Sequence, residues 1–398
     1  MSAAKRGTGV VIVGAKRTCI GSFMGCHKDT GVAQLGATAA KGAIAQAGIS
    51  PEDVEEVVMG CVIQAGVGQA PARQVALGAK MGLNTPSTTI NKVCASGMKS
   101  VMMAAQGVQA GDRKIMLAGG MENMSQIPHY MNLRVPTGFG DAKAVDGIQH
   151  DGLTDAYSKE LMGKCTEGVV QRMGITREMQ DAFAIGSYEK SRLAQKNGIF
   201  SSEIVGVEVV DRKGKTTTFL EDEECKKFFP EKFPSLRPAF DKDGSITAAN
   251  SSKINDGAGA MVLMCEEEAL ARGLKPLARI IGYDDAAVEP ADFAIAPADA
   301  CKRLFAKTGI APSDIDFHEI NEAFSAVALA NMQLLDIDAS KVNVHGGAVS
   351  LGHPIGCSGS RILISLMNVL SRQNGTLGMA SICNGGGGAS AIILERMN

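Results

Sequence analysis

The sequence carries almost no net charge, no long apolar run and no closely spaced pair of cysteines. Its 40 basic and 42 acidic residues give a formal net charge of -2, which excludes a strongly basic nucleic-acid binder, although a local basic patch could hold a phosphorylated ligand. No segment approaches the ~20 apolar residues of a membrane span. The ten cysteines lack a CxxC pair and residues 1–9 are too short for a signal peptide, so we expect reduced thiols in a cytoplasmic protein. A chain already trimmed of a presequence would look the same, and the mitochondrial matrix is therefore the alternative location.

Glycine is abundant in this chain, whereas proline is scarce. The 398 residues include 47 glycines and 13 prolines, which indicates many tight turns and close backbone approaches. The 45% hydrophobic and 21% charged residues are typical of a soluble globular protein, and at ~150 residues per domain the length favours two or three domains.

Strand-like and helical segments alternate along the chain. Val10–Val13 and Val57–Met59 are short and apolar, as strands are, whereas residues 31–48 place apolar side chains on one side of a helix. Residues 71–81 are also predicted to be helical, with Pro71 at the first position. This alternation predicts an α/β fold built on βαβ units.

One order of elements occurs twice. Cys94–Gly97 is predicted to open an amphipathic helix that leads to a strand at 115–117 and then to a pair of glycines. Ser358–Gly359 is predicted to open a second such helix, which leads to a strand at 379–382 and to four glycines. This repetition predicts a duplicated α/β unit whose two loops face each other.

The stretch from about residue 125 to residue 250 differs from the rest and is predicted to be an insertion with its own structure. It contains the charge run Glu221–Glu224, followed by Lys226 and Lys227. We interpret this run as a solvated surface turn.

Cys94 is a candidate nucleophile. A helix N-terminus offers partial positive charge and unsatisfied N–H groups, which predict a lowered thiol pKa. The small residues 95–97 leave room for a carbonyl carbon. A buried, inert cysteine is the alternative.

Two further segments offer acid–base chemistry. His353 stands in a glycine-rich loop, 346–356, which suits a base of fixed geometry, with a structural histidine as the alternative. Cys383 precedes four glycines whose N–H groups can accept an oxyanion. Phosphate binding competes with that interpretation, but neither GxGxxG nor a Walker lysine follows.

The segment His318–Phe324 superficially resembles a zinc motif. HExxH requires a second histidine where this chain has Glu322, so the metal interpretation fails. Asn321 is then a neutral donor that could anchor a water or a carbonyl, while His318 suits a core position equally well.

Taken together, these motifs resemble the thiolase family. The likeness covers effectively the whole chain and is closest to the biosynthetic, acetoacetyl-CoA type, in particular to its mitochondrial-type members. The motifs that carry it are 13–18, Asn91–Gly97, Gly119–Ser125, Asn250–Gly257, Ala286–Pro290 with Asp292–Phe293, Asn321–Phe324, Gly352–Gly356 and Cys383–Gly387.

The resemblance implies a five-layered α-β-α-β-α fold and a chemistry for each motif. Residues 1–123 with 254–272 would form one half, 273–398 the other, and 124–253 a loop domain that binds coenzyme A. Cys94 would take the acetyl group from acetyl-CoA with activation by His353, and Cys383 would remove the α-proton of a second acetyl-CoA. Asn321, through a water, would stabilise one oxyanion together with His353, and the N–H groups of Cys94 and Gly385 would stabilise the other.

The resemblance also implies binding positions and an assembly. No cofactor is obligatory, coenzyme A being a substrate, and a homodimer or homotetramer without nucleic-acid or membrane partners is expected. Leu161 stands where many members have histidine, Ser251 stands where alanine is usual, and Phe293 would shape the pocket for a 2-methyl branch. Coenzyme A would contact Leu153, Met162, Phe240, Ala248, Ser252 and Phe324, and potassium would lie at Tyr188, Ala248, Ala249, Ser251 and Val349.

Three alternatives remain at this point. A degradative thiolase acting on longer or 2-methyl-branched 3-ketoacyl-CoAs would share the four motifs that contain Cys94, Asn321, His353 and Cys383. It would differ in its relative turnover of substrates of different chain length. A ketoacyl synthase would pair its cysteine with two histidines or with histidine and asparagine, and Cys383 argues against that. A non-catalytic acyl-CoA-binding protein is disfavoured because all four catalytic side chains are retained.

Overall fold

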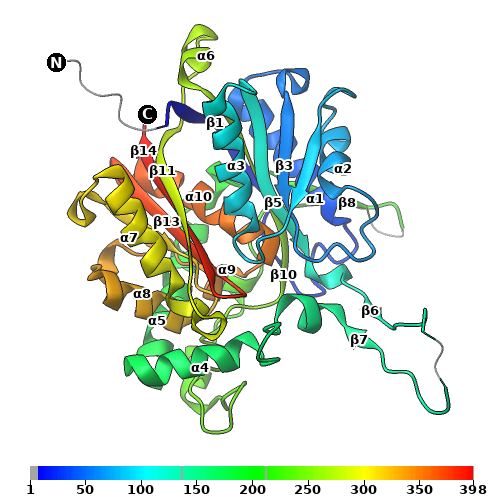
Figure 1. The fold of residues 1–398 in the computed structure, drawn as a ribbon, viewed down its shortest axis with the longest axis vertical. Coiled ribbons are helices and arrows are strands. Elements are labelled where there is room, and N and C mark those ends of the chain that lie inside the picture. The colour runs from blue at the N-terminus through cyan, green and yellow to red at the C-terminus, as the bar shows by residue number, and fades with distance from the viewer. Residues whose placement is uncertain (1–7, 136–137, 211–212, 398) are drawn as a thin grey trace.

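The computed structural model describes residues 8–135, 138–210 and 213–397, which form a mixed α/β fold around one large sheet (Figure 1). In spatial order the described strands of this sheet are β12 (Phe317–Ile320), β13 (Leu377–Asn384), β14 (Gly388–Arg396), β11 (Ala278–Ala287), β1 (Val10–Arg17), β10 (Asn255–Cys265), β5 (Ile115–Asn123), β3 (Glu56–Gly60) and β4 (Ser87–Ile90), with β2 (Gly21–Ser22) paired to β10. The predicted α/β class is therefore confirmed.

The sheet contains the predicted duplication. The order β3-β5-β10-β1 in the first half corresponds to β12-β13-β14-β11 in the second. In each half the first pair is parallel and the next two pairs are antiparallel. Among the described strands, the two halves are joined within the sheet by the short pairing of Val11 with Arg279 and Ile12 with Ala278.

Helices form three layers around the two halves of the sheet. The helices α3 (Ser96–Ala110) and α10 (Ile355–Arg372) pack against each other in the middle. The helices α1 (Val32–Ala47) and α2 (Pro71–Gly78) cover the outer face of the first half, and α7 (Ala296–Thr308) covers that of the second. The arrangement is the expected α-β-α-β-α order.

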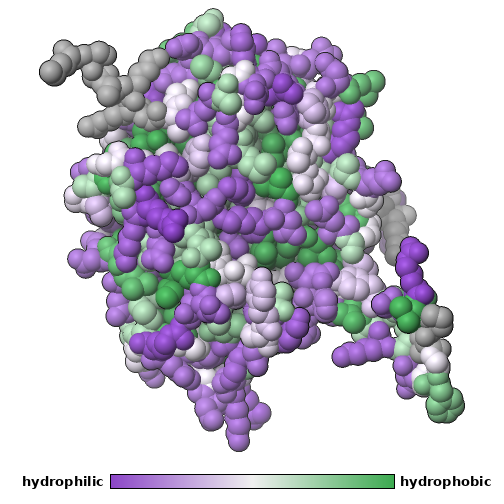
Figure 2. All heavy atoms as spheres, viewed as in Figure 1, coloured by the Kyte–Doolittle hydropathy of each residue, from purple (hydrophilic) through white to green (hydrophobic). Residues whose placement is uncertain are grey.

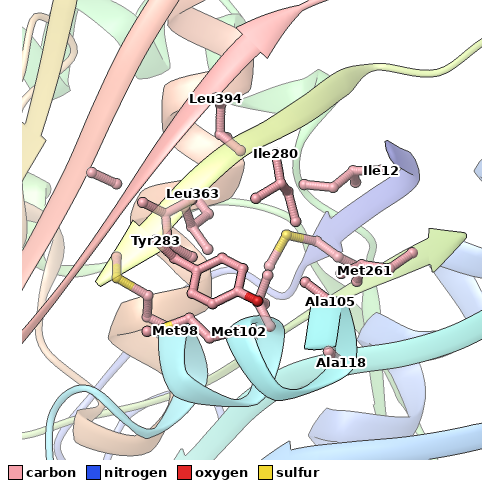
Figure 3. Packing of buried hydrophobic residues seen from close by; sticks show 14 of the residues in the cluster. Ile12, Met98, Met102, Ala105, Ala118, Met261, Ile280, Tyr283, Leu363 and Leu394 are labelled. Carbon is pink, nitrogen blue, oxygen red and sulfur yellow. The ribbon is translucent and has the colours of Figure 1, made fainter. Parts of the chain in front are cut away.

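The middle layer is held by a dense apolar cluster. Figure 3 shows Met98 and Met102 of α3 packed toward Tyr283 of β11, with Leu363 of α10 and Leu394 of β14 behind them. All these side chains are buried, and each large apolar side chain removed from water contributes about 1.5–3 kcal/mol. Because this cluster contains residues of both halves, it fixes α3 relative to α10.

Two glycines let these helices touch at their N-terminal ends. A Cβ on Gly359 would lie 2.3 Å from the backbone nitrogen of Met98, and one on Gly97 would lie 2.8 Å from the nitrogen of Ser360. Any larger side chain would force the helices apart. The loops that precede α3 and α10, which carry Cys94 and His353, are thereby held close together.

The helices α4 (Met162–Met173) and α5 (Arg177–Lys196), which lie between β5 and β10 in the chain, are in the lower part of the molecule in Figure 1, and the same segment includes a projecting two-stranded hairpin. The domain boundaries proposed from the sequence remain a prediction. Among the described residues, no helix combines the length and apolar character needed to cross a membrane. This region also contains β6 (His129–Tyr130), β7 (Val145–Asp146), β8 (Val207–Val210) and β9 (Thr216–Phe219), while α6 (Glu266–Ala271), α8 (Ser325–Leu335) and α9 (Ala348–Leu351) follow it in the chain.

The interpretation of the charge run as a solvated turn is wrong for two of its acids. Asp222 is fully buried and receives two hydrogen bonds from the guanidinium of Arg17, at 2.8 and 2.9 Å. Glu203 accepts a third from the same group at 2.7 Å. Glu224 is also buried. The run therefore anchors the inserted region to β1.

Helix ends differ from the expectations by a few residues. The helix α10 begins at Ile355 rather than at Ser358, and α2 ends at Gly78 rather than at Met81. The helix α1 follows the prediction closely, since Gly48 ends it in the left-handed conformation.

Candidate active site

Cys94 lies in a tight turn between β4 and α3. The preceding Val93 has a φ of 46°, which is a strained conformation for a β-branched residue. The Asn91 side chain accepts a hydrogen bond from the Val93 N–H at 2.8 Å, and the Ser96 hydroxyl donates to the Val93 carbonyl at 2.7 Å. These contacts hold the turn that presents the thiol.

A buried acidic side chain, Glu122, lies near enough to this turn to affect the Cys94 thiol electrostatically. Glu122, at the end of β5, accepts hydrogen bonds from the N–H groups of Val62, Ile63 and Gly356, at 2.9–3.2 Å. Burial raises the pKa of Glu122 to about 7 even though the three N–H groups favour its charged form. The side chain thus ties β5 and the loop after β3 to the first turn of α10.

Both candidate thiols are protonated at neutral pH. Desolvation raises the pKa of Cys94 to about 12, although the N–H groups of Gly385 and of Cys94 itself lower it. Burial, and after it the nearby Cys94, raises the pKa of Cys383. The expectation of a lowered Cys94 pKa is wrong for the free protein, because the helix begins only at Ser96 and desolvation outweighs its field.

His353 is held in one tautomer. Its Nδ1 lies 2.5 Å from the hydroxyl of Ser358, which donates its own proton to the Pro354 carbonyl at 3.0 Å. With the hydroxyl proton assigned to the Pro354 carbonyl, the hydroxyl oxygen accepts from Nδ1–H, and Nε2 keeps its lone pair. Burial lowers the pKa of His353 to about 3, helped by the charge of Arg361, so the ring is neutral.

Asn321 faces the same imidazole. Its Nδ2 lies 3.4 Å from Nε2 of His353, and its Oδ1 is buried without a hydrogen-bond partner in the described part of the chain. Asn321 follows β12 directly, and its N–H donates to Ser381 of the parallel neighbour β13. Since Cys383 lies on β13, this strand pair brings the amide and the second thiol to one end of the sheet.

A cleft of about 290 Å³ leads to His353. Phe240 and Phe324 lie edge to face in its wall, with ring centroids 5.9 Å apart, and Leu161 also lines it. Ala248 lies instead on a neighbouring cavity, together with Tyr188 and Ala249. The other positions predicted to contact coenzyme A all line the cleft, namely Leu153, Met162, Phe240, Ser252 and Phe324.

Phe293 and Gly385 lie beside the two thiols. Phe293 is buried in one apolar cluster with Cys383 and Phe324. A Cβ on Gly385 would be 3.6 Å from Val93 and 3.8 Å from the sulfur of Met162, which places Gly385 between the Cys94 turn and the cleft. The predicted pocket residue and the predicted oxyanion donor therefore both border the site.

The predicted potassium positions do not fit a potassium ion in this chain. The ammonium of Lys253 donates hydrogen bonds to the carbonyls of Ser251 at 2.8 Å and Val349 at 3.0 Å. It also lies 5.2 Å from the ring centroid of Tyr188. A protein cation already uses two of the carbonyl oxygens that would hold the ion.

Sequence reasoning missed three supporting residues. Glu122 lies within the motif Gly119–Ser125 but was assigned no role, and Ser358 was predicted only to open a helix. Lys253 lies within the motif Asn250–Gly257, and its length and charge are the signal that could have identified it.

Two thiols, a neutral imidazole and an amide beside one cleft define an enzyme of thiol-dependent acyl transfer. The "Thiolase, N-terminal domain" family matches residues 10–267, and the "Thiolase, C-terminal domain" family matches residues 274–396. The chain belongs to the thiolase family.

Similar proteins span nearly the whole chain. Acetyl-CoA acetyltransferase B, mitochondrial, of Xenopus laevis is 52% identical over 98% of this chain and 92% of its own length. The probable acetyl-CoA acetyltransferase of Dictyostelium discoideum is 49% identical over 99% and 95%. The Acat5 thiolase of Ascaris suum in complex with coenzyme A has a TM-score of 0.93 at 44% identity, covering 97% of this chain and 99% of that one. The Bacillus anthracis acetyl-CoA acetyltransferase has a TM-score of 0.95 at 38% identity, covering 99% and 100%.

Proposed function

We propose that this protein is an acetyl-CoA C-acetyltransferase, which reversibly condenses two molecules of acetyl-CoA to acetoacetyl-CoA and coenzyme A. The observation that carries the proposal is the convergence of Cys94 and Cys383 beside a neutral His353 and a cleft of suitable size. The names of the relatives, which are acetyl-CoA acetyltransferases, support the same activity.

In the first step the Cys94 sulfur attacks the thioester carbonyl of acetyl-CoA. The thiol proton passes to the bare Nε2 of His353, and the departing coenzyme A thiolate takes that proton. A base whose Nδ1–H is fixed by Ser358 offers only Nε2 for this transfer. The acetyl group is then bound to Cys94 as a thioester.

In the second step the Cys383 thiol first gives its proton to the neutral His353, and the resulting thiolate removes an α-proton from a second acetyl-CoA. The carbanion attacks the acetyl-Cys94 carbonyl, the carbon–carbon bond forms, and the Cys94 sulfur leaves and takes up the proton held by His353. Asn321 with a water and His353 would stabilise the enolate oxygen, and the N–H groups of Cys94 and Gly385 the tetrahedral oxyanion. Each donor supplies about 3 kcal/mol of transition-state stabilisation.

Acetoacetyl-CoA cleavage tests the proposal. The purified protein should consume acetoacetyl-CoA only when coenzyme A is added, and Cys94→Ala should lose the activity by at least ~1,000-fold, since the nucleophile is gone. Cys301→Ala is the matched control, because Cys301 is a buried thiol on α7 outside the cleft. A folded wild-type protein without cleavage would refute the proposal.

A degradative thiolase acting on longer or 2-methyl-branched chains is the second candidate. Phe293, packed beside Cys383, is the residue whose ring would contact a branch or an extended chain. Comparing kcat/KM for acetoacetyl-CoA, 2-methylacetoacetyl-CoA and 3-ketooctanoyl-CoA, in wild type and Phe293→Ala, separates the two. A preference of the wild type for the longest substrate would favour this candidate.

We also propose a homodimer or homotetramer. The hairpin near β6 and β7 projects from the body (Figure 1), and hydrophobic colour is visible on it at the lower right of Figure 2. Met131, Leu133, Val135 and Phe139 of this segment are exposed. Such an apolar arm suits contact with a second copy. The test is to measure by sedimentation the oligomeric state of the wild type and of a Leu133→Ser, Phe139→Ser double variant. A monomeric wild type would refute the proposal.

The proposed location remains the cytoplasm, with the mitochondrial matrix as the alternative. The mitochondrial names of several relatives support the alternative. Fractionation of the source cells with an antibody to this chain would decide between the two. We propose coenzyme A as a substrate, with no obligatory cofactor.

A further inference from the structure

Lys253 stands where two cavities meet. It lines the cleft that contains His353 and also a second cavity of about 400 Å³ bordered by Tyr188, Ala248 and Ala249. Its ammonium donates hydrogen bonds to the carbonyls of Ser251 and Val349. The side chain therefore spans the wall between the cavities.

The surroundings of this ammonium are those of a cation site. Two carbonyl oxygens accept from it, and the ring of Tyr188 lies 5.2 Å away, within the range of a cation–π contact. Burial lowers the pKa of Lys253 to about 8, while the carboxylates of Glu224 and Glu322 favour its charged form and Lys227 opposes it, so the ammonium is charged at neutral pH. Carbonyl oxygens, an aromatic ring face and nearby carboxylates stabilise a monovalent cation, whether it is a lysine ammonium or a free ion.

Both carbonyls belong to segments that shape the active site. Ser251 is followed by Ser252, which lines the cleft and whose N–H donates to Ala323 at 3.0 Å. Val349 lies in α9, its own N–H donates to Glu322 at 3.0 Å, and His353 follows it by four residues. One ammonium thus joins the wall of the cleft to the segment that carries the base.

We propose that Lys253 is a built-in monovalent cation, a positioning residue that replaces a bound potassium ion and holds the residue 251–252 segment against α9. The expected effect of this residue on catalysis rests on the acetyltransferase function proposed above, whereas its expected effect on stability does not. The wild-type enzyme is then indifferent to whether the solution contains potassium or sodium.

Removing the side chain should convert the site into one for a free ion. Lys253→Ala leaves the carbonyls, the Tyr188 ring and the carboxylates, together with space for potassium or ammonium. Lys253→Met keeps the bulk of the stem and lacks the charge, so it should not accept an ion. Lys232→Met is the matched control, because Lys232 borders the same cavity while its ammonium lies over Phe229.

The test measures thermal unfolding and kinetics in potassium chloride and in sodium chloride at equal ionic strength. We expect Lys253→Ala to melt several degrees lower than wild type in sodium and to recover in potassium, and its KM for acetoacetyl-CoA to rise about tenfold in sodium and fall back in potassium. Wild type, Lys232→Met and Lys253→Met should each give the same values in both salts.

Two results would overturn the proposal. One is a wild-type enzyme that melts higher or turns over faster in potassium than in sodium. The other is Lys253→Ala responding identically to the two salts. The unfolding measurement requires no turnover, so it stands even if the wild type proves unable to cleave acetoacetyl-CoA, which would refute only the proposed function.

Discussion

The Ser358 hydroxyl lies 2.5 Å from Nδ1 of His353 and is the contact that decides which nitrogen of the imidazole is free. Ser358 is one helical turn into α10, and its proton is already committed to the Pro354 carbonyl. The orientation of the base is therefore set by the first turn of a helix rather than by a carboxylate.

Replacing Ser358 with alanine should slow the enzyme without unfolding it. The Nδ1–H would lose its acceptor in a buried place, and an unmet buried hydrogen bond costs about 1–3 kcal/mol, or roughly tenfold to hundredfold in kcat. Ser360→Ala is the control, because its hydroxyl bonds Cys357 and not His353. Equal kcat values for the two variants would contradict the assigned role.

Cys94 should behave as an ordinary protonated thiol in the free enzyme. Desolvation raises its pKa to about 12 and burial lowers that of His353 to about 3, so no thiolate–imidazolium pair forms at neutral pH. Alkylation of Cys94 by iodoacetamide, followed by mass spectrometry, should therefore accelerate about tenfold per pH unit up to pH 9. A plateau already reached at pH 7 would show a stabilised thiolate instead.

Gly359→Ala should damage both stability and activity. The added methyl group would meet the Met98 backbone nitrogen at 2.3 Å, and overpacking of this kind costs about 1–3 kcal/mol or more. We expect a lower melting temperature and at least a tenfold loss of kcat, because α3 and α10 would separate at the ends that carry Cys94 and His353. Gly186→Ala on α5, where a Cβ meets open space, is the control.

Arg17→Met should destabilise the protein strongly. Both Asp222 and Glu203 would lose their buried partner, and such a loss costs about 3–5 kcal/mol. Arg113→Met, which breaks a pair with Glu56 at the surface, should cost at most about 1 kcal/mol. Calorimetric melting of both variants checks this, and similar melting temperatures would refute it.

Glu122 should make stability depend on pH. Its pKa is raised from 4.5 to about 7 in the folded state, so its protonated form favours folding. The contribution is present below pH 4.5 and is lost as pH rises to about 7, in total roughly 3 kcal/mol. The melting temperature of wild type relative to Glu122→Gln should therefore fall between pH 5 and pH 7 and then level off. A difference independent of pH would contradict the assignment.

The elements predicted well from the sequence are those determined by nearby residues. The helix α1 and the strand β1 follow from local apolar periodicity, and Gly48 ends the helix where a left-handed residue is needed. The duplicated order of elements was visible because each copy repeats a local pattern of helix, strand and glycines. The candidate catalytic residues could be named because each belongs to a compact motif.

What the sequence did not reveal depends on contacts between distant segments. The burial of Asp222 requires Arg17, which lies 205 residues away along the chain. The place of the Lys253 ammonium depends on Val349, 96 residues away. Desolvation, which only the packed structure supplies, raises the pKa of Cys94. The sequence shows only that Cys94 is close to a helix N-terminus, and that feature alone predicted a lowered pKa.

The division of the chain into two similar halves has a consequence for how the enzyme matures. Cys94 lies in the first half, whereas Asn321, His353 and Cys383 lie in the second, and the halves meet at a short strand pairing, in the central helix layer and through the ion pairs of Lys92 and Lys99 with Asp285. A nascent chain that has folded only its first half would contain the nucleophile Cys94. It would lack both His353, which activates that thiol, and Cys383, which removes the α-proton. Turnover would therefore begin only when the last strands, β13 and β14, have joined the sheet. The time at which activity appears during refolding would then be the time at which these strands join the sheet.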